Sequence, residues 1–271
     1  MKLGIIGLEG AGKTTVFEAL TGSTGGAALR GEDRVGTVKV PDERVDILSR
    51  MYNPRKTIYA QVEYFLPGRG GDKKAGENVW TAVRDCDALI QVVRNFEAYG
   101  LAPPQPAADV ADLDGELILA DLVVVEKRLE RLALDRKRGK AVSDEEIGLL
   151  EQCKECLEAD QPLRTKPELA GAPLLRGFAF VSAKPILVLF NNADEDEEIP
   201  DVGALTERER CRVIRGQIEQ ELAQMSEEEA QDFLAEFEIA ASAADRVIQE
   251  SYALQGLISF FTVGEDEVRA W

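Results

Sequence analysis

Short apolar runs alternate with longer amphipathic segments along the first part of the chain. Apolar runs of the length expected for buried strands lie at residues 3–7, 36–40, 59–66 and 88–93, and a helix-like segment begins at Lys13. Strands that alternate with helices are typical of a mostly parallel sheet with helices on its faces. The pattern therefore predicts an α/β domain.

The hydrophobic period changes after the proline-rich stretch at residues 103–106. Apolar residues then recur at steps of four and three, which is typical of a coiled-coil seam: Ile118, Leu122, Val125, Leu129 and Leu132. A turn at residues 136–142 and a Ser143-x-x-Glu146 capping box predict a return helix. We expect an antiparallel helical hairpin at residues 113–165, inserted between the two parts of the α/β domain, 1–112 and 166–271.

Apolar runs resume after the predicted hairpin. Residues 178–181 and 185–190 have the pattern of buried strands. We expect a helix over residues 207–225, a second that starts after Ser226, and a third over residues 245–254.

Between the first predicted strand and helix, Gly7 to Thr14 have the spacing of a phosphate-binding P-loop, Gly-x-x-x-x-Gly-Lys-Thr. Glycines allow successive N–H groups to turn toward phosphate oxygens, and the helix adds its positive dipole end. Lys13 would reach the β and γ phosphates, and the Thr14 hydroxyl would be a ligand of Mg²⁺. The alternative is an ordinary glycine-rich turn. The residues predicted to surround phosphate are Glu9, Gly10, Ala11, Gly12, Lys13, Thr14 and Thr15.

Composition excludes several classes of protein. The chain has 271 residues, 45% of them hydrophobic, which is normal for a globular core. No run of eighteen apolar residues and no export signal is present, so we expect a cytoplasmic protein that does not enter a membrane. The chain has no histidine, which excludes a mechanism built on a histidine base.

Cys153 and Cys156 form a Cys-x-x-Cys motif in a strongly helical stretch. A zinc site would need further ligands, and the chain contains neither a second such pair nor a histidine. We therefore interpret the motif as a packed thiol pair in a reducing compartment.

The formal net charge of −18 argues against binding of nucleic acid by bulk electrostatics, and no direct DNA binding is expected. Two local basic patches, residues 136–140 and 50–56, could contact RNA. The simpler interpretation of each is a solvated loop or helix end.

Asn191 and Asp194 follow the predicted strand at residues 185–190. Guanine-nucleotide proteins recognise their base with an Asn that supports the loop and a carboxylate three residues later that accepts the base protons. A Lys usually follows that Asn, and here Asn192 takes its place. An acidic turn is the alternative interpretation.

Several segments resemble the YchF, or Obg-like ATPase, branch of the P-loop GTPases, and the resemblance covers essentially the whole chain. They are the P-loop, Phe17–Thr21, Val40–Leu48, Ala183–Pro185 with Asn191, and Ser251–Trp271. The resemblance implies a Ras-like G domain of the P-loop NTPase fold with an inserted helical coiled coil. It also implies binding of ATP or GTP with Mg²⁺, slow hydrolysis, and association with ribosomes or translation factors. Members have a C-terminal TGS domain, which is absent here, so we expect a truncated chain or one that has lost this module.

The chain departs from the family pattern at the positions that support the metal and the base. The family's Asp-x-x-Gly is matched by Phe65-Leu-Pro-Gly68, which keeps the Gly68 N–H for a γ-phosphate but supplies no carboxylate for Mg²⁺. Arg30 lies near the place of the first-switch Thr, and Arg215-Gly216 replace a Ser-Ala loop over the base. Family members that prefer ATP have Asn-x-x-Glu, so Asp194 leaves the choice between ATP and GTP open.

Two hypotheses follow, with a weaker third. The chain is a slow ATPase or GTPase in which Lys13 and Thr14 position phosphates and metal, or it is a scaffold that binds nucleotide without turnover and acts through its helical arm. The third is that the P-loop is kept only as a structural turn. Loss of metal support weakens phosphoryl transfer more than it weakens phosphate binding.

Overall fold

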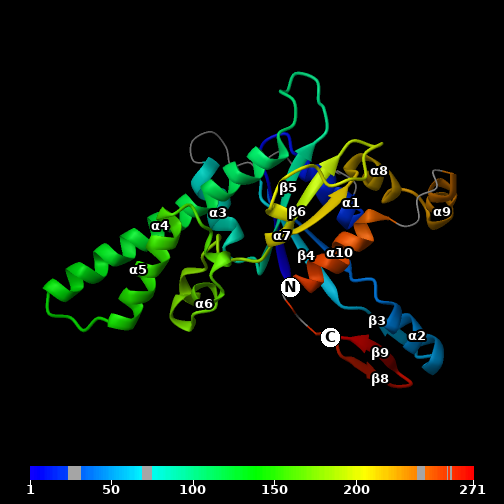
Figure 1. The fold of residues 1–271 in the computed structure, drawn as a ribbon. Helices are drawn as coiled ribbons and strands as arrows, with labels where there is room; N and C mark the ends of the chain where they lie inside the picture. The colour runs from blue at the N-terminus through cyan, green and yellow to red at the C-terminus, as the bar shows by residue number, and fades with distance from the viewer. Residues whose placement is uncertain (24–31, 69–74, 237–241, 255, 257) are drawn as a thin grey trace.

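The central sheet has six strands, in the order β2-β4-β1-β5-β6-β7. The computed structural model describes residues 1–271 except 24–31, 69–74, 237–241, 255 and 257 (Figure 1). Only β2 runs antiparallel to its neighbour in this sheet, so the mostly parallel sheet is confirmed. The strands are β1 (Lys2–Ile6), β2 (Arg34–Lys39), β4 (Gln61–Leu66), β5 (Ala88–Asn95), β6 (Ile186–Asn192) and β7 (Arg210–Ile214).

Helices cover both faces of this sheet because its inner strands are apolar on both sides; every residue of β6 is buried. One face packs against α1 (Lys13–Thr21) and α10 (Ala243–Ala253), and α8 (Gly216–Leu222) packs beside α1. The other face packs against α3 (Ala75–Val83) and the first turns of α4 (Pro106–Lys137). The phosphate loop is thus part of a three-layer α/β fold.

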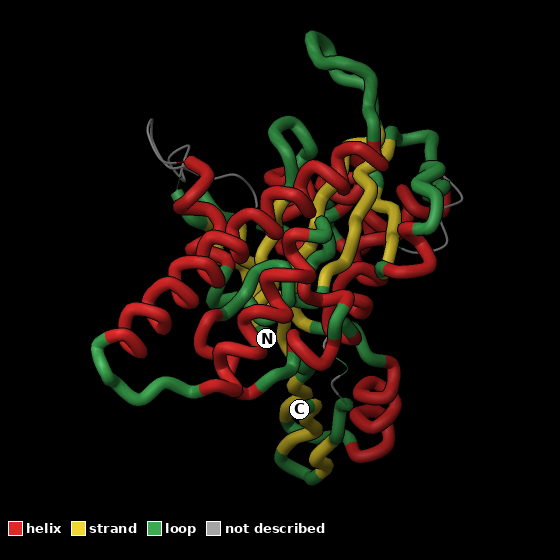
Figure 2. The backbone as a smooth tube through the Cα atoms, turned by 60° about the vertical axis from the view of Figure 1, so that its left-hand side comes forward, coloured by secondary structure: helices red, strands yellow, loops and turns green. Residues whose placement is uncertain are grey.

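The helical hairpin consists of α4 and α5 (Asp144–Glu158), and it extends away from the sheet (Figure 1, Figure 2). The predicted seam lies in one apolar cluster with residues of α5, and Glu146 N donates to Ser143 Oγ at 3.1 Å as the capping box requires. The helix α4 is continuous from Pro106, so its first turns belong to the sheet's core and its later turns to the hairpin. The limits at residues 112 and 165 between the α/β domain and the inserted hairpin remain a prediction.

Cys153 and Cys156 are buried free thiols in the seam between α4 and α5. Burial raises the pKa of the Cys153 thiol to about 11. No group of three or more His, Cys, Asp or Glu that could hold a metal occurs among the described residues. Both thiols are thus packed in the apolar cluster of the hairpin, as predicted.

Two predicted elements are wrong. Residues 178–181 do not form a strand: the 3₁₀ helix η2 (Pro173–Phe178) ends there, and Val181 N and Ser182 N donate to the carboxylate of Asp121 instead of to a strand. Residues 207–225 are not one helix. That region contains the end of α7 (Leu205–Arg208), then β7 and α8.

The last two predicted helices are present as α9 (Glu227–Glu236) and α10.

A second sheet, in the order β3-β9-β8, joins β3 (Lys56–Ile58) to β9 (Glu267–Ala270) and β8 (Phe261–Val263) beside α2 (Glu43–Tyr52). The remaining short elements are η1 (Leu163–Thr165) and α6 (Pro167–Ala170). None of the helices in the described part of the chain is long and apolar enough to cross a membrane.

Candidate functional site

The P-loop pattern lies between β1 and α1, at the carboxyl edge of the parallel strands, where α/β proteins bind ligands. Its glycines have positive φ angles of 153° at Gly7 and 86° at Gly12. A Cβ atom at Gly7 would lie 2.4 Å from the Val92 carbonyl oxygen, and one at Gly12 would lie 2.3 Å from Asn191 Nδ2. Close approach of neighbouring groups, as well as the turn, therefore requires glycine at both positions.

The side chain of Lys13 folds back over the loop from the first turn of α1. Its Nζ atom donates to the carbonyl oxygens of Gly7 and Leu8, both at 2.7 Å. An ammonium group and the positive end of a helix dipole thus meet at the same loop, which favours an anion there. Thr14 is exposed on the following helical position, where its hydroxyl can face a ligand.

The other predicted phosphate contacts follow the same loop. Glu9 is exposed, Gly10 and Thr15 are half-buried, and Ala11 is buried. Backbone N–H groups, which need no particular side chain, would make most contacts to phosphate from these positions.

Asn191, at the carboxyl end of β6, links the P-loop to the start of α8. Its Nδ2 atom donates to Ala11 O at 3.1 Å, and its Oδ1 atom accepts from Gly216 N at 3.0 Å. The side chain is buried, so both bonds are shielded from water. Asn191 thus supports the loop, as its position after the strand predicts.

Asp194 is exposed three residues beyond Asn191, and Arg215 Nη1 donates to its carbonyl oxygen at 3.4 Å. Partial burial raises the pKa of the Asp194 carboxyl, and the nearby carboxylates of Glu195 and Glu221 raise it further. The structure therefore brings the P-loop, Asn191, the backbone of Asp194 and the Arg215-Gly216 segment to one place.

Phe65 points into the core, on β4. Its side chain is buried in the apolar cluster that contains Ile6, Val83 and Leu89, and Lys2 Nζ lies 4.5 Å from its ring centroid. An aromatic ring in this place supplies no metal ligand. P-loop hydrolases generally use Mg²⁺, so the Thr14 hydroxyl is the candidate ligand that the pattern retains.

Gly68 follows β4, and its N–H group donates to Asp33 Oδ1 at 2.8 Å. A γ-phosphate could use this N–H only by displacing Asp33, which sequence reasoning did not connect with the site. Arg30 lies outside the described residues.

A loop between β5 and α4 also contacts the P-loop, and sequence reasoning missed it. A Cβ atom at Gly10 would lie 3.1 Å from Leu101 Cδ1, so the Leu101 side chain rests on the loop. Arg94 holds this segment by donating to Phe96 O at 3.2 Å and Ala102 O at 2.7 Å. Because an apolar residue in a proline-rich loop has no motif, only the three-dimensional structure could assign it.

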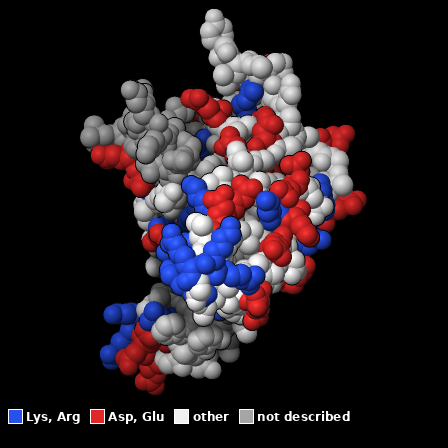
Figure 3. Space-filling model, turned by 90° about the vertical axis from the view of Figure 1, so that its left-hand side faces the viewer, with Lys and Arg blue, Asp and Glu red and all other residues white. Residues whose placement is uncertain are grey.

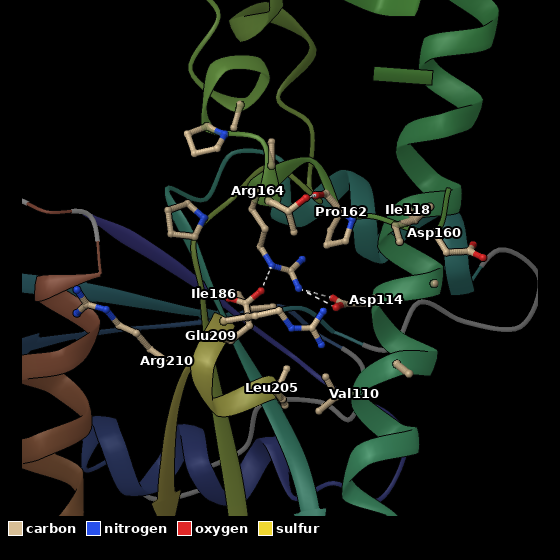
Figure 4. Close-up of a pocket in the computed structure, with 18 of the residues that line it drawn as sticks. Val110, Asp114, Ile118, Asp160, Pro162, Arg164, Ile186, Leu205, Glu209 and Arg210 are labelled. Carbon is tan, nitrogen blue, oxygen red and sulfur yellow. Dashed lines mark hydrogen bonds and ion pairs between the residues drawn. The ribbon is translucent and has the colours of Figure 1, made fainter. Parts of the chain in front are cut away.

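A cavity of about 1240 Å³ lies elsewhere, near the amino ends of β6 and β7 (Figure 4). Figure 4 shows Arg164 between Asp114 of α4 and Glu209, with ion-pair distances of 2.7 and 2.6 Å. Two carboxylates thus face the largely buried guanidinium of Arg164. This cavity lies between α4 and the amino ends of β6 and β7, and it is not the phosphate site.

Comparisons with known proteins agree with this geometry. No protein-family model matches the chain. It is 32% identical to the "Ribosome-binding ATPase YchF" of Bacillus subtilis over 291 residues, and 33% identical to the protein of that name from Haemophilus ducreyi over 293 residues. These alignments cover 99% and 100% of this chain, and 80% of each relative. The solved structure of the Schizosaccharomyces pombe YchF GTPase matches with a TM-score of 0.78 and 27% identity, over 100% of this chain and 80% of that one. The P-loop NTPase fold is therefore confirmed.

Proposed function

The chain belongs to the YchF family, and on that basis we propose that it binds a purine nucleoside triphosphate and acts with the ribosome or another part of the cytoplasmic translation machinery. The observation that carries the proposal is the P-loop, in which Lys13 Nζ lies 2.7 Å from two loop carbonyl oxygens at the start of α1. Related proteins named as ribosome-binding ATPases support the choice of partner.

We assign the phosphates to the N–H groups of residues 9–15 and to Lys13. An incoming triphosphate would offer its oxygens to the Lys13 ammonium in place of the Gly7 and Leu8 carbonyls, a charge-assisted contact. Gly68 is the proposed γ-phosphate contact, and Thr14 is the proposed ligand of Mg²⁺. Bound Mg²⁺ would neutralise charge on the phosphates.

For the base we propose Asn191 as the support and Asp194 as the acceptor of base protons. Arg215 packs beside them through its bond to Asp194 O. The relatives are named as ATPases and the solved structure as a GTPase, so both ATP and GTP are candidates.

We further propose that hydrolysis is slow or lost. Positioning and metal-ion charge contribute most of the catalysis of phosphoryl transfer. Phe65 is buried in the core where the family's Asp-x-x-Gly would begin, so one support of the metal is replaced by an apolar ring. The alternative function is a scaffold that binds nucleotide and acts through its helical arm. It rests on the same buried position of Phe65.

The test is calorimetric titration of the full chain with ATP and GTP, with and without Mg²⁺, followed by single-turnover hydrolysis. Binding that strengthens with Mg²⁺, followed by slow phosphate release, supports the hydrolase. Binding that ignores Mg²⁺, without phosphate release, supports the scaffold. Absence of binding by either nucleotide at about 1 mM would reject both the hydrolase and the scaffold. A Kd of this size corresponds to a binding free energy of only about 4 kcal/mol.

A further inference from the structure

Asp33 binds the N–H group of Gly68, which is the group that the proposed function assigns to a γ-phosphate. Gly68 N donates to Asp33 Oδ1 at 2.8 Å. The β2–β4 ladder ends at the pair of Arg34 and Leu66, so this bond lies just beyond the carboxyl end of β4. Because β4 is parallel to β1, which leads into the P-loop, Gly68 and the P-loop lie at the same edge of the sheet.

The residue that follows Asp33 is tied to the helix behind the P-loop. Arg34 Nη1 lies 2.8 Å from Glu18 Oε1 on α1, and its guanidinium lies 4.7 Å from the centroid of the Phe17 ring. The side chains of this ion pair are largely buried, with exposed fractions of 19% for Arg34 and 11% for Glu18. The start of β2 is therefore anchored, and the cation nearest to Asp33 in the sequence is paired with Glu18.

The Asp33 side chain itself is exposed, so it can leave Gly68 by rotation about its own bonds while the backbone of β2 stays in place. An exposed hydrogen bond competes with water and contributes little to stability. The six residue pairs that join β2 to β4 do not depend on it. The needs of the fold therefore do not account for a carboxylate at this position.

A γ-phosphate and the Asp33 carboxylate would compete for the same donor. Both are anions whose oxygens accept a charge-assisted hydrogen bond from an N–H group, and their like charges repel each other when they are close. A nucleoside diphosphate brings no third phosphoryl group to this position. Asp33 thus opposes the binding of a triphosphate and does not oppose the binding of a diphosphate.

We propose that Asp33 is a specificity-determining residue, a latch that holds the γ-phosphate position and lowers the affinity for nucleoside triphosphate relative to diphosphate. The inference rests on the proposed function, in which Gly68 contacts the γ-phosphate. The apparent affinity for a triphosphate is the intrinsic affinity multiplied by the fraction of molecules in which the latch is open. The affinity for a diphosphate carries no such factor.

The test compares the Asp33→Ala variant with the unmodified chain by calorimetric titration in the presence of Mg²⁺. The ligands are ADP, GDP and the ATP and GTP analogues in which an imido group bridges the β and γ phosphorus atoms and prevents hydrolysis. The quantity measured is the ratio of triphosphate to diphosphate affinity, because a general loss of P-loop geometry would lower both affinities. Circular dichroism verifies that the variant is folded.

General electrostatic repulsion has to be separated from the latch. The net charge is −18, and Figure 3 shows Asp and Glu side chains over much of one face of the molecule. The matched control is Glu32→Ala, which removes the same charge from the adjacent exposed residue and leaves the bond between Asp33 and Gly68 in place. A second variant, Asp33→Asn, removes the charge but keeps an oxygen that can accept from Gly68 N.

We expect Asp33→Ala to raise the affinity for the triphosphate analogue about three- to tenfold and to change the affinity for the diphosphate by less than about twofold. Asp33→Asn should give an intermediate rise, because a neutral acceptor holds the donor less strongly. Glu32→Ala should leave the ratio of the two affinities within about twofold of the ratio in the unmodified chain.

An unchanged ratio in Asp33→Ala, or an equal rise in Glu32→Ala, overturns the latch. A fall in triphosphate affinity together with loss of its dependence on Mg²⁺ also overturns it, since Asp33 would then be a ligand of the metal.

Diphosphate binding distinguishes this failure from failure of the proposed function. If the unmodified chain binds diphosphate and the ratio does not respond to Asp33→Ala, only the latch is rejected. Absence of binding by every nucleotide rejects the proposed function, and the latch with it.

Discussion

Asn191 is the side chain that ties three separate segments into one site. Replacing it with alanine removes its bonds to Ala11 O and Gly216 N and leaves both groups buried without this partner. We expect Asn191→Ala to lower the free energy of unfolding by about 2–3 kcal/mol and to weaken nucleotide binding, because the P-loop loses its support. Urea unfolding and calorimetric titration measure the two effects.

Asn192 offers the matched control. Its Nδ2 atom donates to Glu198 O at 2.7 Å and its Oδ1 atom accepts from Asn95 Nδ2 at 3.0 Å, so it carries similar bonds without a contact to the P-loop. Asn192→Ala should also destabilise the fold but should change nucleotide affinity much less. Equal losses of affinity in the two variants would contradict the role assigned to Asn191.

The P-loop residues could be predicted from the sequence because motif spacing is local. Gly7 to Thr14 lie between a strand and a helix as the pattern requires. The contact of Leu101 with Gly10 and the bond from Gly68 N to Asp33 could not be predicted, because neither Leu101 nor Asp33 belongs to a motif. Phe65, which the sequence matches to the family's carboxylate position, has its side chain buried in the core.

Among the elements, buried strands were predicted well because continuous apolar runs identify them. The strand β7 was missed because it alternates charged with apolar residues at one edge of the sheet, a pattern that a short helix can share. Residues 178–181 were predicted as a strand, but Phe178 and Phe180 stack at 5.2 Å, and the next N–H groups bond to Asp121. The second sheet pairs residues 56–58 with 267–269, and local patterning carries no signal for such a distant pairing.

Asp121 joins α4 to two neighbouring segments and is fully buried. It accepts from Val181 N at 3.1 Å, from Ser182 N at 2.7 Å and from Arg84 Nη1 at 3.2 Å. Asp121→Ala would leave the two backbone N–H groups without their acceptor and remove the ion-pair partner of Arg84, so we expect a loss of about 3–5 kcal/mol in the free energy of unfolding. Denaturant unfolding followed by circular dichroism measures this loss.

The control for this element is Asp112→Ala, an exposed position on the same helix. It should change the free energy of unfolding by no more than about 0.5 kcal/mol. A loss of similar size in both variants would contradict the role assigned to the buried carboxylate of Asp121, because alanine has a higher helix propensity than aspartate.

The whole molecule should become less stable in alkaline solution. Burial raises the pKa of Cys86, Cys153 and Cys211 from an ordinary 9.0 to about 11. Between these values the unfolded chain loses thiol protons that the folded chain keeps, which favours unfolding. The free energy of unfolding should therefore fall as pH rises from 9.0 toward about 11, as a series of urea titrations would reveal.

The same burial predicts slow reaction of all four cysteines with a thiol reagent until the chain unfolds. A free energy of unfolding that stays constant or rises over this pH range, together with rapid labelling of the folded chain, would contradict the buried thiols.

Every functional proposal for this molecule depends on nucleotide binding at the P-loop. Calorimetric titration with ATP and GTP in the presence of Mg²⁺ tests this binding by comparing the unmodified chain with the Lys13→Ala variant. The matched control is Lys39→Ala, an exposed lysine on β2 at the opposite edge of the sheet. We predict that the unmodified chain and Lys39→Ala bind equally, and that Lys13→Ala binds at least about a hundredfold more weakly, a loss of roughly 2.7 kcal/mol or more. Binding by Lys13→Ala that matches the control would show that the nucleotide does not depend on this loop.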